Sequence, residues 1–436
     1  FATAPDYLNC IVPRRLSLHM PKSVGGPASA VEPDANYDHV ILGALRATFD
    51  SGITLPLEWR LKQLTALRNG VAAWKEKIIA AVALDMGRPE FETTNIELAP
   101  LDGDIAIIQR DLPSFVRPED VSTPLTLFPA TTTRTPQPKG VVLILAPWNF
   151  PIRLALLPLA AALAAGNVAL VKPSEKAPNC AALVRDLIHT FLDAEAIAVV
   201  EGDGKVAASL LEHKFDHIFY TGSESAGRQV YAAAARHLTP VTLELGGKNA
   251  CYVHSDVDIE VTARRLLHGA LVNCGQMCLG LDLAYVHTSL LRPLIAALKT
   301  TLKEWYGDNP RESKSLGRLI TSQHTWRLQR MLELSGSEII VGGDVDVDSK
   351  YFAPTIVLEP LRDSALRREE SFGPFLVLVV VQDMDEAIRA QRNVPTPLCK
   401  YVFANDGKVA KDYMARVKGG MGCINDTMFH AANPEV

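Results

Sequence analysis

The sequence predicts an α/β protein with two doubly wound units, each a parallel sheet between layers of helices. The first observation is the apolar run 140–146, which has the length of a strand and ends at Pro147. Continuous apolar runs are typical of parallel strands that are covered on both faces. The second observation is that strand and helix signals alternate after this run, and the third is that the alternation resumes from residue 247. This pattern indicates doubly wound sheets with right-handed crossovers.

The N-terminal part is expected to be irregular at first and then helical. Residues 1–35 are rich in proline, so we expect them to lie over the surface. From Asp38 to Leu84 apolar residues recur at helical spacing. The residues that define this period are Leu57, Leu61, Leu64, Leu67 and Val71.

The segment between Phe115 and Gly140 changes to threonine and proline with little apolar core. Its parts 121–127 and 130–135 are either the arms of an exposed hairpin or an unstructured loop. A lone hairpin is marginally stable and needs a partner, for which another subunit is one candidate. The residues alone leave both interpretations open.

The first unit continues with alternating helices and strands. We expect helices from about Ile152 and over 181–192, and strands over 168–171, 198–200 and 216–220. The last of these strands leads through a glycine-bounded turn into a helix. The apolar stretch 154–171 contains Pro158, Gly166 and Asn167, so it predicts a buried helix feeding a buried strand rather than a membrane span.

The second unit contains a helix whose N-terminus Asp256 or Asp258 can cap. Its apolar side consists of Ile259, Leu266, Leu267, Ala270 and Leu271. We expect this helix to end near Cys274–Gly275. Cys278 then falls in the loop that follows.

Composition excludes several classes of protein. The 436 residues carry a formal net charge of -5, and no basic patch with interleaved aromatics occurs, so nucleic acid is not an expected partner. Seven scattered cysteines indicate free thiols in a reducing, cytoplasmic compartment rather than a disulfide framework. Cys274 and Cys278 have no histidine nearby, so no metal site is expected. The chain begins at Phe1, which suggests a fragment, and we expect membrane association only through segments missing from it.

Cys278 becomes a candidate nucleophile because of the turn that precedes it. A free cysteine is more often a small buried apolar residue. Gly275, however, permits a tight turn in which backbone N–H groups face the sulfur. Such donors would favour the thiolate, which is the reactive form, and would also stabilise an oxyanion.

Glu244 and Asn149 follow apolar strand signals. Glu244 is either an exposed carboxylate on a polar strand face or, because Gly246 and Gly247 follow it, a partly desolvated general base beside a ligand. Asn149 is either a turn residue between two prolines or an oxyanion donor at the carboxyl end of a parallel strand.

Two further strand ends suit a nucleotide. The segment 222–227 follows a strand and opens a helix, which favours a phosphate, although it lacks the G-x-G-x-x-G fingerprint and could be a plain capped turn. Lys172 and Glu175 can hydrogen-bond ribose hydroxyls, and the alternative is an exposed ion pair.

Six motifs in order make the combination specific. They are Pro-Trp-Asn-Phe-Pro (147–151), Lys-Pro-Ser-Glu (172–175), Tyr-Thr-Gly-Ser (220–223), Leu-Glu-Leu-Gly-Gly-Lys (243–248), Gly-Gln-Met-Cys (275–278) and Glu-Glu-Ser-Phe-Gly-Pro (369–374). From about Asp38 to its end the chain resembles the aldehyde dehydrogenase superfamily. The short N-terminal region and residues 419–426 look most like its class 3, fatty-aldehyde branch.

The resemblance implies a role for each site residue. Cys278 would be the nucleophile, Glu244 the general base, and Asn149 with the Cys278 backbone N–H the oxyanion hole. The residues it implies for cofactor binding are Trp148, Lys172, Glu175, Gly222, Ser223, Leu245, Gly246, Glu370 and Phe372. The cofactor would be NAD, with NADP possible, and the substrate a small-molecule aldehyde.

The resemblance also implies the organisation of the chain. Residues 1–121 and 140–246 would form the NAD(P)-binding domain, 122–139 a hairpin that joins two subunits of a homodimer, and 247–436 the catalytic domain. The family continues beyond the point where this chain stops, and without that segment part of the substrate funnel would be open. Leu281-Asp282-Leu283 stands where relatives often have Pro-Asp-Tyr, which would alter the pocket wall. Two rivals remain: transfer of the acyl group to coenzyme A, and a non-catalytic protein on the same scaffold.

Overall fold

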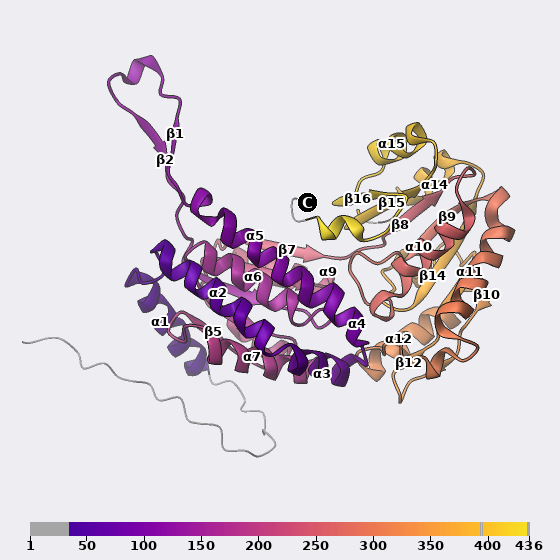
Figure 1. Ribbon diagram of the computed structural model, residues 1–436, viewed down its shortest axis with the longest axis horizontal. Helices are drawn as coiled ribbons and strands as arrows, with labels where there is room; N and C mark the ends of the chain where they lie inside the picture. Colours follow the sequence, from indigo (N-terminus) through magenta and orange to yellow (C-terminus); the bar gives the residue numbers. More distant parts are fainter. Residues whose placement is uncertain (1–34, 393, 395, 434–436) are drawn as a thin grey trace, which may run out of the picture.

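The computed structural model describes residues 35–392, 394 and 396–433. These residues form two helix-covered sheets, one from each half of the chain, and a hairpin that projects from the body (Figure 1). The predicted fold class, with two α/β units, is confirmed. The Pro-rich segment predicted for residues 1–35 lies, apart from its last residue, outside the described residues.

The first sheet has five parallel strands in the order β5–β4–β3–β6–β7. They are β3 (Val141–Leu145), β4 (Val168–Lys172), β5 (Ile197–Val199), β6 (His217–Gly222) and β7 (Val241–Leu245). The chain runs from β3 outward through β4 to β5 and then returns to the other side of β3 with β6. Ligands of doubly wound sheets bind at such a reversal, at the carboxyl ends of the strands. Here that point lies between β3 and β6.

Helices cover both faces of this sheet. One face carries α6 (Arg153–Ala164) and α7 (Pro178–Phe191), against which α2 (Leu57–Ala73), α3 (Lys75–Met86) and α5 (Ala99–Phe115) pack. The other face carries α1 (Ala35–Asp50), α8 (Gly204–Leu210) and α9 (Glu224–Ala235). The predicted helical stretch 38–84 is therefore three helices. Leu64, Leu67 and Val71 of its periodic residues are buried, as expected for the core-facing side.

A change of helical pitch lies between α3 and α5. The short helix α4 (Glu90–Glu92) continues into a π-helical segment, η1 (Thr93–Leu98), and then into α5. Single π turns inside helices frequently mark functional sites. This turn holds the buried side chain of Glu97.

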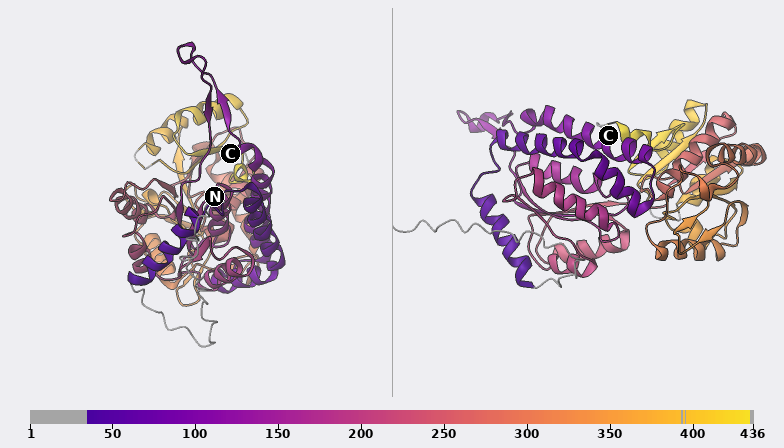
Figure 2. Two further views of the ribbon diagram at one scale, coloured as in Figure 1. Left: turned by 90° about the vertical axis from the view of Figure 1, so that its left-hand side faces the viewer. Right: turned by 60° about the horizontal axis from the view of Figure 1, so that its bottom comes forward.

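The hairpin consists of β1 (Glu119–Val121) and β2 (Thr132–Arg134), joined around the 3-10 turn η2 (Leu125–Leu127). Its first arm thus begins at Glu119, so the predicted start at residue 122 is wrong, and the predicted arm 121–127 contains mostly the turn. Leu125 in this turn is 91% exposed, so the tip packs against no core in the part of the chain that the structure describes. Figure 2 shows the hairpin extending beyond the body from two further directions.

The second sheet has seven strands in the order β10–β13–β14–β9–β8–β15–β16, and only β10 is antiparallel to its neighbour. They are β8 (Ala250–Val253), β9 (Leu283–His287), β10 (Glu338–Val341), β13 (Thr355–Leu358), β14 (Phe375–Val381), β15 (Cys399–Phe403) and β16 (Met421–Ile424). A two-stranded sheet of β11 (Val345–Asp346) and β12 (Tyr351–Phe352) lies beside them. The change of sheet falls between β7 and β8, close to the predicted boundary at residue 247.

The helices of this half are α10 (Ile259–Leu271), α11 (Leu291–Tyr306), α12 (Ser322–Glu333), α13 (Ala365–Arg368), α14 (Met384–Gln391) and α15 (Gly407–Arg416). Short 3-10 turns complete it: η3 (Val272–Gly275), η4 (Thr288–Leu290), η5 (Pro310–Glu312) and η6 (Phe429–Ala432). Of the two predicted caps, Asp258 is the one used, because its carboxylate accepts the Val261 N–H at 3.0 Å. The helix α10 ends at Leu271, earlier than predicted, and Asn273 and Cys274 then adopt φ of +54°.

The predicted buried helix and strand over 154–171 are α6 and β4. Within the described part of the chain, no helix combines the length and apolarity needed to cross a membrane. The same residues contain no group of three or more His, Cys, Asp or Glu side chains arranged to hold a metal ion.

Candidate active site

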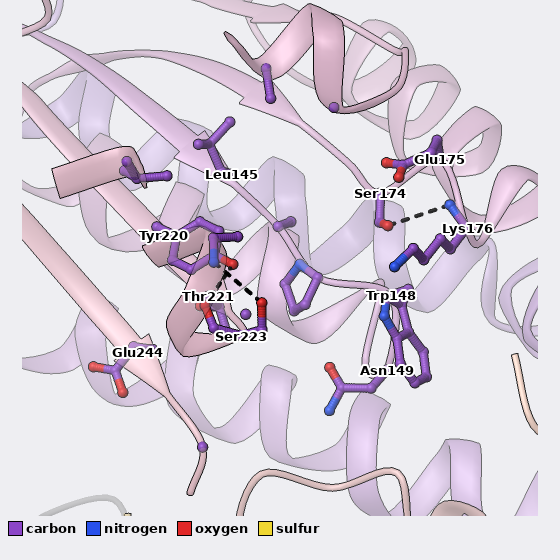
Figure 3. Close-up of a pocket in the computed structure, with 18 of the residues that line it drawn as sticks. Leu145, Trp148, Asn149, Ser174, Glu175, Lys176, Tyr220, Thr221, Ser223 and Glu244 are labelled. Atoms are coloured by element: carbon purple, nitrogen blue, oxygen red, sulfur yellow. Dashed lines mark hydrogen bonds between the residues drawn. The ribbon is translucent and has the colours of Figure 1, made fainter. Parts of the chain in front are cut away.

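A cavity of about 540 Å³ lies at the carboxyl ends of the first sheet and reaches the loop that carries Cys278. Figure 3 shows its wall formed by the turns after β3, β4 and β6, with Glu244 at the end of β7. The site residues of the sequence analysis that line it are Trp148, Asn149, Lys172, Glu175, Gly222, Ser223, Glu244, Gly246, Cys278, Glu370 and Phe372. Leu245 is the exception, because its Cδ2 lies 2.9 Å from where a Cβ would stand on Gly227.

The Cys278 loop is fixed from both sides. The Asn249 side chain donates to the carbonyls of Cys278 at 2.7 Å and Gly280 at 2.8 Å. Gly275, with φ of +70°, passes so close to Gly373 that a Cβ on it would lie 2.0 Å from the Gly373 carbonyl oxygen. The predicted tight turn is therefore present, and a larger residue would displace it.

Burial opposes the ionisation expected for Cys278. The backbone N–H groups of Cys278 and Leu279 do face the sulfur and lower its pKa, as predicted. Burial and the nearby Glu370 carboxylate outweigh them and raise the pKa of the thiol to about 12. Burial disfavours the charged form of an acid, and a like charge adds to this effect. Burial therefore favours the thiol form of Cys278 over the thiolate.

The rate at which iodoacetamide alkylates Cys278 should rise about tenfold per pH unit between pH 7 and 10. The reason is that thiolate reacts, and its fraction grows tenfold per unit below the pKa. The measurement is peptide mass spectrometry of Cys278 in protein without cofactor. Cys423, which is partly exposed and has a raised pKa, serves as an internal comparison. A plateau in the Cys278 rate below pH 8 would contradict the raised pKa.

Asn149 points its amide toward the Cys278 loop. Its Nδ2 donates to the Gln276 carbonyl at 3.2 Å, and the Asn273 Nδ2 donates to the same carbonyl at 2.9 Å. The second N–H of the Asn149 amide is available for another acceptor. An amide held beside a nucleophile in this way can stabilise an oxyanion.

The Glu244 carboxylate has no hydrogen bond or ion pair among the described residues. It lies near the end of β7 and lines the cavity (Figure 3). Glu244 is exposed on β7, as in the first of the two interpretations, and the partial burial of its carboxylate still raises its pKa. A carboxylate with a raised pKa is a stronger base than one in water. It is suited to take a proton from a water molecule in the cavity.

The other end of the cavity has the features of a nucleotide site. Lys172 Nζ lies 3.6 Å from the Glu175 carboxylate, and burial lowers the pKa of this lysine. The Ser223 side chain caps α9 by accepting the Ala226 N–H. The start of α9 therefore faces the cavity at the sheet's reversal point, where a phosphate binds favourably.

The buried carboxylate of Glu370 indicates whether a dinucleotide fits the cavity. Its Oε1 is buried without a hydrogen-bond partner in the described residues, and a Cβ on Gly246 would lie 2.1 Å from this atom. Burial and Asp282 raise the pKa of Glu370 to about 8. A buried acceptor on the cavity wall suits a ligand that brings a hydroxyl, as a ribose does. The residues present fit the cofactor.

Aromatic rings border this region. Trp148 packs edge-on against Phe372, with ring centroids 5.3 Å apart, and against His324 at 5.2 Å. Sequence reasoning missed His324 and Arg327, which come from α12, and also Lys176. Lys176 directly follows a recognised motif, so its position could have been noticed. His324 and Arg327 resemble any polar residues of an amphipathic helix and gave no signal.

Comparison with known proteins finds relatives over most of the chain. A family model described as "Aldehyde dehydrogenase family" matches residues 30–435. The chain is 41% identical to aldehyde dehydrogenase family 3 comG of Dictyostelium discoideum over 398 residues, which cover 91% of this chain and 84% of that protein. It is 37% identical to the 4,4'-diaponeurosporen-aldehyde dehydrogenase of Staphylococcus aureus, covering 90% and 85%.

Solved structures give the same result for the fold. The substrate-bound state of Staphylococcus aureus AldH matches with a TM-score of 0.89 at 36% identity, covering 91% of this chain and 87% of that chain. A putative aldehyde dehydrogenase, PutA, from Anabaena variabilis matches with a TM-score of 0.85 at 25% identity, covering 92% and 86%.

Proposed function

The chain belongs to the aldehyde dehydrogenase family, whose enzymes depend on NAD(P), and from that premise we propose that it oxidises an apolar aldehyde to a carboxylic acid through a thioester on Cys278. The observation that supports this most is that Cys278, Asn149 and Glu244 line one cavity, which continues to the nucleotide features beside β4 and β6.

In the proposed reaction the Cys278 thiol gives its proton to a water molecule of the cavity, and the thiolate sulfur then attacks the aldehyde carbon, whose carbonyl oxygen becomes the oxyanion. The Asn149 amide and the Cys278 backbone N–H stabilise the resulting oxyanion. A dinucleotide held by the residues named below would supply the acceptor for the hydride that leaves the adduct, and the adduct thereby becomes a thioester. Glu244 then takes a proton from water, and the hydroxide formed attacks the thioester and releases the acid.

The dinucleotide would be held by the residues described above. Lys172 and Glu175 would bind the adenosine ribose, Gly222 and Ser223 the pyrophosphate, and Glu370 the nicotinamide ribose. Phe372 and Trp148 would border that ribose, and Leu245 and Gly246 would lie near the nicotinamide. NAD is the proposed preference, because the Glu175 carboxylate repels a 2′-phosphate.

Replacing Glu175 with glutamine should raise the ratio of NADP to NAD efficiency (kcat/KM) about fivefold to tenfold. The reason is that removing one charge a few ångströms from the phosphate relieves about 1 kcal/mol in water. The measurement is steady-state kinetics with both cofactors at fixed aldehyde. Glu212→Gln, at an exposed carboxylate paired with Arg236, is the matched control and should leave the ratio unchanged. A ratio equal in wild type and Glu175→Gln would remove Glu175 from the proposed ribose site.

The substrate preference rests on the surroundings of the nucleophile. Cys278 packs against a hydrophobic cluster that includes Leu279, and Leu398 and Met421 pack against the same cluster. One relative is named for a 4,4'-diaponeurosporen-aldehyde. A panel of long aliphatic, aromatic and terpenoid aldehydes against succinic semialdehyde, with each cofactor, tests the proposal. The apolar aldehydes should have the higher kcat/KM, and a preference for succinic semialdehyde would contradict it.

The same panel separates the two rivals. Release of free acid without added thiol supports hydrolysis by Glu244, whereas turnover that requires coenzyme A would support acyl transfer. No turnover of any aldehyde would support the non-catalytic scaffold.

We also propose a homodimer joined through the β1–β2 hairpin, whose exposed apolar tip includes Leu125 and Phe128. A cytoplasmic location is proposed as well, because the cysteines of the described residues are free.

A further inference from the structure

A buried charged pair lies behind the active site. Arg88 follows α3, its side chain is 1% exposed, and its Nη1 donates to Glu97 Oε2 at 2.6 Å. Glu97 belongs to the π-helical segment η1 and is fully buried. Removing both charges from water is costly, and apolar residues of similar size would often serve stability as well. The hydrogen bonds that Arg88 and Glu97 make to neighbouring loops therefore suggest a role other than stability.

The Arg88 guanidinium donates hydrogen bonds to two loops, the one that carries Asn149 and the one that precedes Cys278. Its Nη2 donates to the backbone carbonyl of Asn149, and its Nε donates to Asn273 Oδ1 at 2.9 Å. Glu97 Oε1 accepts the N–H of Ile152 at 2.7 Å, just after the Asn149 loop. One rigid fork thus contacts the loop after β3 and the turn before Cys278.

Asn273 completes the connection. Its Nδ2 donates to the Asn149 carbonyl at 3.0 Å and to the Gln276 carbonyl at 2.9 Å. The second of these carbonyls also accepts the Asn149 amide. The backbone of Asn273 adopts φ of +54°, and its N–H donates to Glu92 Oε2 at 3.1 Å. Both ends of Asn149, its carbonyl and its amide, are therefore fixed through this one residue and Arg88.

We propose that Arg88 is a positioning residue that sets the Asn149 amide against Cys278 and acts on the oxyanion step through Asn149. This inference rests on the roles proposed above for Cys278 and Asn149. The proposal gives a side chain that does not line the cavity a role in one reaction step. If Arg88 only stabilised the fold, its replacement would weaken catalysis, thiol reactivity and cofactor binding together. If it positions Asn149, its replacement should lower catalysis alone.

Two variants test the proposal. Arg88→Lys keeps the charge opposite Glu97, but a lysine is a point charge that cannot span both Asn273 Oδ1 and the Asn149 carbonyl. The double variant Arg88→Met/Glu97→Gln removes both charges of the pair together, so Glu97 is not left as an unpaired buried charge. The side-chain carbonyl of the introduced glutamine can still accept the Ile152 N–H. Arg60→Lys is the matched control, because Arg60 is also buried and donates to the backbone carbonyls of Thr54 and Ala164 away from the cavity.

The readouts separate positioning from folding. They are kcat with saturating aldehyde and NAD, the alkylation rate of Cys278 by iodoacetamide, the Kd of NADH from fluorescence, and Tm. Alkylation forms no oxyanion, so its rate measures the reactivity of the Cys278 thiol and does not depend on stabilisation by Asn149. We expect kcat to fall about tenfold or more in both Arg88 variants, with alkylation and the NADH Kd within twofold of wild type. Arg60→Lys should keep the wild-type kcat.

Two results would overturn the proposal. One is a kcat within twofold of wild type in Arg88→Lys or in the double variant. The other is a parallel loss of kcat, alkylation and NADH binding in the Arg88 variants, which would show a structural role only. If the double variant does not fold, Arg88→Lys decides alone by the same criteria. Failure of the proposed function is distinguishable, because it would appear as no turnover of any aldehyde by the wild-type protein or as full activity of protein that lacks the Cys278 thiol.

Discussion

Replacing Cys278 with alanine is expected to lower the rate of aldehyde oxidation by about 10⁴-fold or more while NADH still binds. Loss of a covalent nucleophile removes the path through the thioester, and residual rates then come from binding alone. Cofactor binding should survive, because the proposed ribose and phosphate contacts come from the ends of β4 and β6 and from Glu370. The measurements are NADH production with saturating aldehyde and NADH fluorescence titration.

Cys423→Ala is the matched control for this substitution. Cys423 is also a partly exposed free cysteine, on β16, and it does not line the cavity. Its replacement should leave the oxidation rate near that of wild type. Undiminished turnover in Cys278→Ala would remove Cys278 as the nucleophile and with it the proposed mechanism. Equal losses in both variants would show that the assay reports damage to the fold.

The parts of the fold that the sequence predicted well are those set by local patterns. The apolar runs at β3 and β4 are buried at every position, so their lack of alternation correctly indicated strands covered on both faces. The cap at Asp258 follows from one side chain and a nearby N–H. The start of the hairpin was wrong, because Glu119 and Arg134 pair across the arms with no apolar pattern to mark them.

The site was predicted as far as motifs mark it. Eleven of its twelve residues line the cavity. Eight of them lie at or just after the ends of β3, β4, β6 and β7, whereas Cys278, Glu370 and Phe372 come from loops of the second half. The pKa of Cys278 could not be predicted, since it depends first on burial and then on Glu370, which lies 92 positions away in the sequence. Arg88 gave no signal, because its partners Asn149 and Asn273 are 61 and 185 positions away and one arginine after a helix has no pattern.

Replacing Glu244 with glutamine is expected to slow steady-state oxidation about 10²- to 10³-fold, within the range that general-base catalysis contributes. The amide keeps the size of the side chain but cannot take a proton from water, so the thioester should form and then persist. A rapid-mixing experiment should therefore show one NADH per active site released at nearly the wild-type rate, followed by slow turnover. Mass spectrometry should find the acyl group on Cys278.

The pH dependence provides a second measurement of the same role. Because partial burial raises the pKa of Glu244, the base is protonated and lost as the pH falls through that raised value. Thioester hydrolysis in wild type should slow on that acidic side, and Glu244→Gln should lack this dependence. Glu338→Gln, on the exposed strand β10, is the control and should behave as wild type. Loss of the initial NADH release in Glu244→Gln would place Glu244 before the thioester, because a residue needed only for hydrolysis cannot affect the steps that precede it.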